Sequence, residues 1–111
     1  MATKSLLKSE CENYLATISK ALKETDVEVE IEIMSLSLGD QHETNWIKLH
    51  GLSYDSREDI LSVFCEGIDH LIRKPQEINV QEDEKGVQNI AAIGSSGYTH
   101  LIKFREPVKP V

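Results

Sequence analysis

The chain has 111 residues, of which 40% are hydrophobic and 28% are charged, and its formal net charge is −7. These proportions are typical of a folded domain, so we expect a single domain over residues 1–111, with loose termini at 1–8 and 106–111. The negative charge opposes binding to phosphate backbones and anionic lipids, so we expect neither nucleic acid nor a membrane as partner.

Hydropathy and cysteine usage bear on localisation. No apolar run approaches the roughly 18 residues that a membrane-spanning helix needs, and the first residues lack the apolar core of a signal peptide. Cys11 and Cys65 are far apart and lie in apolar surroundings, which indicates two buried thiols rather than a metal or disulfide site. These features predict an acidic cytoplasmic protein.

The first expected element is an amphipathic helix over residues 9–23. Ser9 and Glu12 have the spacing of a capping box, in which each residue satisfies a backbone amide of the other. Behind them, apolar residues recur at helical spacing: Cys11, Tyr14, Leu15, Ile18 and Leu22. This stripe predicts a helix that packs on a sheet.

The segment 27–33, VEVEIEI, alternates between apolar and acidic residues, as expected for a strand with one buried face. The alternation then changes phase, because Met34, Leu36 and Leu38 are the apolar residues of the next segment. Strict alternation cannot change phase, so we expect a bulge near Ile33–Met34.

Further strands follow, separated by polar turns. We expect a short strand at 46–49 that Gly51 interrupts, and a strand at 60–66 whose apolar residues on both faces indicate a central strand covered on both sides. Turns are expected at 55–59, 82–86 and 94–97, and other strand segments at 52–54, 77–80, 87–93 and 98–104. The predicted class is α+β: an N-terminal amphipathic helix followed by a strongly bent antiparallel meander of about five to six strands, or a small, partly closed barrel.

The segment EGIDHLIRKP, 66–75, holds the candidate ligand-binding residues Asp69, His70 and Arg73. An acid beside an imidazole and a cation could form the polar contacts of a small-ligand pocket. The alternative is structural: a short capped turn between two strands, with Leu71 and Ile72 buried. No nucleophile motif accompanies the segment, so it predicts no catalytic residue.

Other candidate sites have weaker signals. The four histidines lack metal-ligand spacing, so we predict no metal and no cofactor; they are His42, His50, His70 and His100. The 94–97 segment, GSSG, lacks the lysine of a phosphate-binding loop and reads as a hairpin turn.

Two surface features leave alternatives open. The carboxylates of Glu28, Glu30 and Glu32 share one strand face, which is either a solvated face or a site for a cation or basic partner. Trp46 is the single tryptophan, and either an interface anchor or core or rim packing would explain it.

Several blocks of the chain resemble a family of small, uncharacterised bacterial proteins, a domain of unknown function. The most specific are LGDQ (38–41), GLSYDSREDIL (51–61) and EGIDHLIRKP (66–75). The likeness extends over about residues 7–107 and implies a bacterial cytosolic protein. It implies no activity and no site residues.

The leading functional hypothesis is a non-enzymatic module that associates with itself or with a protein partner, because the chain is acidic, lacks catalytic motifs and contains edge strands. The alternative is a small-ligand-binding domain or weak enzyme with a pocket near Asp69, His70 and Arg73. A third hypothesis rests on a likeness in architecture to Sm-like RNA-binding proteins, and the negative charge disfavours it.

Overall fold

The computed structural model describes residues 2–35 and 39–110, with the backbone alone for residues 40–44. The described part forms one helix and an eight-stranded sheet in which every pairing is antiparallel. In chain order the elements are β1 (Ala2–Ser5), α1 (Lys8–Ala21), β2 (Glu28–Ser35), β3 (Gly39–Asp55), β4 (Ile60–Cys65), β5 (Ile68–Arg73), β6 (Glu77–Asp83), β7 (Gly86–Ile93) and β8 (Thr99–Val108).

The expected α+β meander of five to six strands that follows an N-terminal helix is therefore wrong. The sheet has eight strands in the order β1-β6-β7-β8-β2-β3-β4-β5, and β1 precedes the helix and pairs with β6. The alternative expectation of a small, partly closed barrel is also wrong, because β1 and β5 are the two open edges of the sheet. Both β1 and the end of β8 lie in the terminal segments, 1–8 and 106–111, that were expected to be loose.

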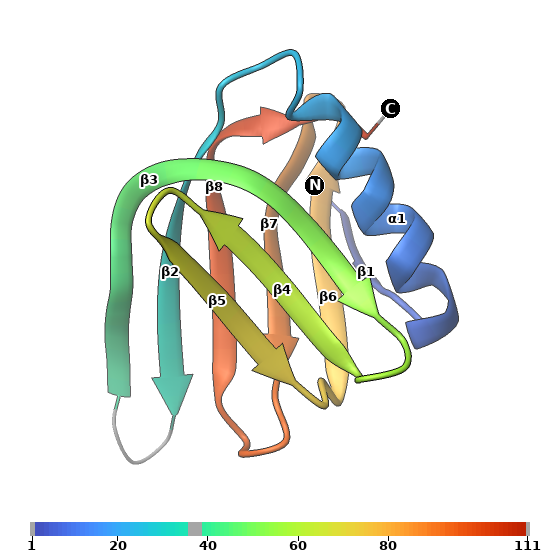
Figure 1. Ribbon diagram of the computed structural model, residues 1–111, viewed down its shortest axis with the longest axis vertical. Coiled ribbons are helices and arrows are strands. Elements are labelled where there is room, and N and C mark those ends of the chain that lie inside the picture. Colours follow the sequence, from blue (N-terminus) through green and yellow to red (C-terminus); the bar gives the residue numbers. More distant parts are fainter. Residues whose placement is uncertain (1, 36–38, 111) are drawn as a thin grey trace.

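Strand β3 folds the sheet into two layers. Its first part pairs with β2, up to the Glu28–Lys48 pair, and its second part pairs with β4, from Leu49 to Asp55. Between them β3 arches over the molecule, so that β4 and β5 lie in front of the layer formed by β6, β7, β8 and β2 (Figure 1). A register shift between Leu49 and Gly51 marks the bend, and the expected strand break at Gly51 is wrong.

The bulge expected near Ile33–Met34 is also wrong. The β2–β3 register shifts earlier, between Val29 and Ile31 and again between Ile31 and Glu32, and the extra residues lie in β3. Strand β2 itself pairs with β8 without interruption from Val29 to Met34. Leu36 and Leu38, on which the phase argument also depended, lie outside the described residues.

The predicted faces of the helix and of β2 are confirmed. Cys11, Leu15 and Ile18 are fully buried, as are Val29 and Ile31 on β2. The helix begins one residue earlier than expected, and the Ser9–Glu12 capping box is wrong: the Leu7 amide donates to the Glu10 carboxylate, and the Glu10 amide donates to the Leu7 carbonyl. The turns expected at 55–59, 82–86 and 94–97 are confirmed.

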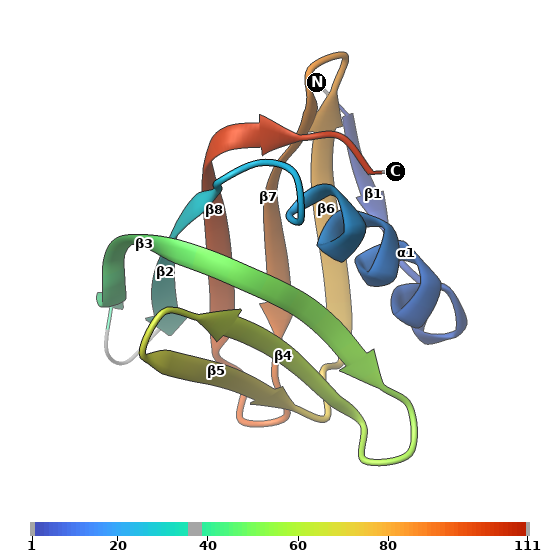
Figure 2. The same ribbon diagram turned by 45° about the horizontal axis from the view of Figure 1, so that its top comes forward.

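Beyond the bend, β2 no longer pairs with β3. Helix α1 instead provides hydrogen bonds to the backbone along this edge of β3. The Ser19 hydroxyl donates to the carbonyl of Leu52 at 2.7 Å and accepts from the Leu52 amide at 3.0 Å. One hydroxyl therefore replaces both hydrogen bonds that a neighbouring strand would make to this residue. This contact fixes the helix beside the second part of β3 (Figure 2).

Candidate interaction surface

The segment EGIDHLIRKP forms a tight hairpin arm, and the expected capped turn is wrong. The turn lies earlier, at Gly67, whose φ of +78° is in the region that glycine adopts most readily. Residues Ile68–Arg73 then form β5, which pairs with β4 from Cys65–Ile68 to Ile60–Arg73. Because side chains alternate along a strand, neighbours in this segment point to opposite faces.

The alternation separates the three candidate ligand-binding residues. His70 points inward and is buried, whereas Asp69 and Arg73 point outward and are exposed. Leu71 and Ile72 separate in the same way: Leu71 is 42% exposed on the outer face and Ile72 is buried on the inner face. Asp69 and Arg73 therefore share a face, and His70 is on the other side of the strand.

The outer face of the β3–β4–β5 layer carries exposed apolar side chains. Phe64 on β4 is 37% exposed and Leu71 on β5 is 42% exposed, and Ile60 on β4 is half-buried. Between these positions Ser62 is buried opposite Leu71. No described element of the chain lies in front of this face in Figure 1. The expectation that β4 is covered on both sides is therefore wrong.

The strand register arranges the outer face in three rows that cross β3, β4 and β5. The first row is Asp55, Ile60 and Arg73; the second is Ser53, Ser62 and Leu71; the third is Gly51, Phe64 and Asp69. The apolar side chains of Ile60, Phe64 and Leu71 thus surround the central Ser62, and on β5 the cation Arg73 and the acid Asp69 flank Leu71 on its two sides. We call this set of nine residues the outer face.

On the inner face, β5 contacts β8 through two buried imidazoles. His70 Nε2 and His100 Nδ1 are 2.9 Å apart, and the ring centroids are 5.0 Å apart. Burial, with a smaller contribution from the neighbouring His70 ring, lowers the pKa of His100 to about 4. The pair therefore joins the two layers with His100 neutral at physiological pH.

A second cluster holds the end of the hairpin. The Asp59 carboxylate accepts from the Tyr54 hydroxyl at 2.5 Å and from Lys8 at 2.9 Å, and these hydrogen bonds lower its pKa. The Asp59 carbonyl accepts from the Lys74 amide at 2.7 Å. Asp59 itself has a φ of +57°, which aspartate tolerates better than most side chains do. The cluster ties helix α1, the β3–β4 turn and the end of β5 together.

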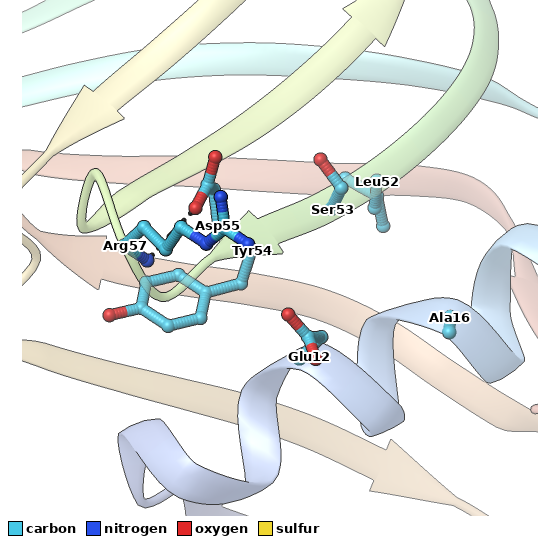
Figure 3. A pocket seen from close by; sticks show the side chains of 7 residues that line it. All are labelled: Glu12, Ala16, Leu52, Ser53, Tyr54, Asp55 and Arg57. Atoms are coloured by element: carbon cyan, nitrogen blue, oxygen red, sulfur yellow. Dashed lines mark hydrogen bonds between the residues drawn. The ribbon is translucent and has the colours of Figure 1, made fainter.

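An open cleft of about 480 Å³ lies between α1 and the end of β3 (Figure 3). The Arg57 amide donates to the Asp55 carboxylate at 2.9 Å, so this acid is engaged within its own turn. None of the three candidate ligand-binding residues lines this cleft. Its lining residues are Glu12, Ala16, Leu52, Ser53, Tyr54, Asp55 and Arg57.

The glutamates of β2 pair with basic residues of β8 on the far side of the molecule. Lys103 lies 3.0 Å from Glu30 and 2.7 Å from Glu32, and Arg105 lies 2.8 Å from Glu28. Arg105 also lies over the ring of Trp46, which is 40% exposed. The basic partner of this acidic strand face is therefore supplied by the chain itself.

The cysteines are buried, as expected, and burial raises the pKa of both thiols. Among the described residues, no three side chains of His, Cys, Asp or Glu are grouped so that they could hold a metal ion. In that same part of the chain, no helix has the length and apolar character needed to cross a membrane.

The fold and the outer face define an open, two-layered antiparallel β protein with one helix and an uncovered apolar surface. The chain belongs to the family described as "Family of unknown function (DUF5335)", which matches residues 2–110. An uncharacterised protein of Aquifex aeolicus (strain VF5) is 35% identical over 109 residues, which is 97% of this chain and 96% of that protein. No solved structure matches the chain. The expectation of an uncharacterised bacterial family is confirmed.

Asp69 and Arg73 were predicted from the sequence as candidate site residues, whereas the exposed Phe64 and Leu71 beside them were not. The sequence IDHLIR could have indicated that Leu71 is exposed, because a strand over these residues exposes either its odd-numbered or its even-numbered positions. That alternation was overlooked because residues 66–75 were interpreted as a capped turn. The exposure of Phe64 was not predicted, because the apolar sequence VFC indicates a run of buried residues.

Proposed function

We propose that this protein is an interaction module that self-associates through the outer face. The observation that carries the proposal is the pair of exposed apolar side chains, Phe64 and Leu71, on a sheet surface that no other described element covers. Exposed apolar groups that are grouped on one surface and flanked by charges are typical of association sites.

The surroundings of these side chains also support association. Asp69 and Arg73, two of the predicted ligand-binding residues, flank Leu71 on an open sheet face rather than in a cavity, so they suit contacts with another chain better than contacts with a small ligand. The face itself is firmly held, because His70 and Ile72 are buried directly behind it. Little ordering is therefore needed before association.

The apolar patch is small, which fits a weak and concentration-dependent association rather than an obligate oligomer. We expect sedimentation velocity between about 5 µM and about 1 mM to show a rise in mass with concentration. Leu71→Lys should weaken this association by about tenfold or more, because it removes a contact worth about 1.5 kcal/mol and inserts a charge.

A matched control is available in the same chain. Leu7 is 67% exposed at the start of α1 and is not one of the nine residues of the outer face, and Leu7→Lys makes the same chemical change. We expect this variant to associate like the parent protein. A parent protein that stays monomeric up to about 1 mM, or equal loss in both variants, would refute the proposal.

A further inference from the structure

The outer face is complementary to a second copy of itself. The middle row of this face contains Ser62 and Leu71, and the two rows on either side place Arg73 beside Ile60 and Asp69 beside Phe64. A two-fold axis along the middle row exchanges the outer rows between copies. It therefore sets Arg73 opposite Asp69 of the second copy, and Ile60 opposite its Phe64.

The geometry points to a face-to-face dimer with this two-fold axis, in which each Asp69 pairs with Arg73 of the other copy and the two Leu71 side chains meet on the axis. The inference rests on the proposed self-association and names its partner and register. Symmetric dimers with self-complementary surfaces are the commonest protein oligomers.

Each element of the row pattern fits this arrangement. Two packed sheets are about 10 Å apart, a distance that Leu, Ile and Phe side chains can fill from both sides. Ser62 is small and buried, so it leaves room beside the Leu71 pair. At the β3 end of the rows, Asp55 is set opposite Gly51, so no like charges meet there.

A different axis gives a different charge pattern. An axis along β4 would set Arg73 opposite Asp55 and leave Asp69 opposite Gly51. Under that arrangement Asp69→Arg would leave association unchanged. Under the arrangement inferred here, the same substitution brings the introduced positive charge against Arg73 of the second copy.

The decisive experiment mixes two charge-reversed variants, Asp69→Arg and Arg73→Asp. Each variant alone should associate about tenfold more weakly than the parent protein, because like charges then face each other twice in the symmetric dimer. An equimolar mixture should associate at about the parental strength, because every charge of one variant meets its opposite on the other. Sedimentation velocity with one variant carrying a dye measures the mixed dimer directly.

Two controls distinguish an effect of the dimer register from an effect of net charge and from a loss of folding. Glu84→Arg makes the same change in net charge as Asp69→Arg at an exposed position in the turn between β6 and β7, and we expect it to associate no more weakly than the parent protein. Circular dichroism of all variants confirms that they are folded. If the parent associates and Leu71→Lys abolishes association, but the mixture stays monomeric or Asp69→Arg has no effect, the register is wrong and the proposed function stands. A monomeric parent protein refutes both.

Discussion

Acid should destabilise this protein through His100, and the size of the effect follows from its burial. The folded-state pKa of His100 is about 4, whereas an unfolded chain has a histidine pKa of about 6.5. Above the unfolded value both states are neutral at this residue, so it adds no pH dependence. Between the two values the unfolded chain binds a proton that the folded protein excludes. Stability therefore falls as the pH falls from about 6.5 towards 4.

The magnitude can be worked out from these two values. At about pH 5 the unfolded state is almost fully protonated at this residue, and the folded state is largely neutral. The resulting loss of unfolding free energy between about pH 7 and about pH 5 is about 2 kcal/mol. The buried position of both rings supports this direction, since a charged imidazole between the two layers would lack water.

Urea titrations at about pH 7 and about pH 5 on the parent protein and on His100→Gln measure this loss. The variant cannot take up the proton, so its unfolding free energy should fall by about 2 kcal/mol less over the same interval. His50→Gln is the matched control, because His50 lies on the surface beside Glu66, and this variant should keep the acid sensitivity of the parent. Equal losses in the parent and in His100→Gln would refute the reasoning, as would an NMR titration midpoint for His100 at or above about 6.5.

Two stability predictions concern contacts away from the outer face. Ser19→Ala removes both hydrogen bonds to the buried Leu52 and should cost about 2 kcal/mol by urea titration; a loss below about 0.5 kcal/mol would show that water replaces the hydroxyl. Gly86→Ala should cost about 3 kcal/mol, because its φ is +126° and an added Cβ would lie 2.6 Å from the backbone of Val108. Gly97→Ala, at a φ of +86° with open space around it, should cost only about 1 kcal/mol, and equal losses at the two glycines would contradict the role of the close contact.

The helix and β2 could be predicted from the sequence because local pattern alone determines them. The apolar stripe of α1 and the alternation of β2 each have a single period, and both periods survive in the structure. The turns at 55–59, 82–86 and 94–97 were equally accessible, since polar residues or glycines mark them. These parts of the fold do not depend on distant contacts.

The remaining elements depend on pairing between distant segments, which local pattern does not encode. Strand β1 has four exposed residues and no alternation, so only its pairing with β6 makes it a strand. Strand β3 continues through Gly51 because β2 supplies its partners before the bend, and β4 and α1 supply them after it. Asp69 and His70 suggested a capped turn, and the register with β4 overrode that local preference.

Contacts between distant segments also hold the outer face in place, although β5, one of its three strands, is an edge strand. Beyond its pairing with β4, β5 has no further strand neighbour in the described sheet, so other contacts must hold it. His70 contacts His100 on β8, and the Lys74 amide bonds to the Asp59 carbonyl at the end of the strand. Both lie on the inner side or at the end of β5, so they fix the strand without using the side chains that point outward. Substitutions of Leu71, Asp69 or Arg73 should therefore change association while the fold persists, which makes the outer face a surface whose function can be tested separately from its stability.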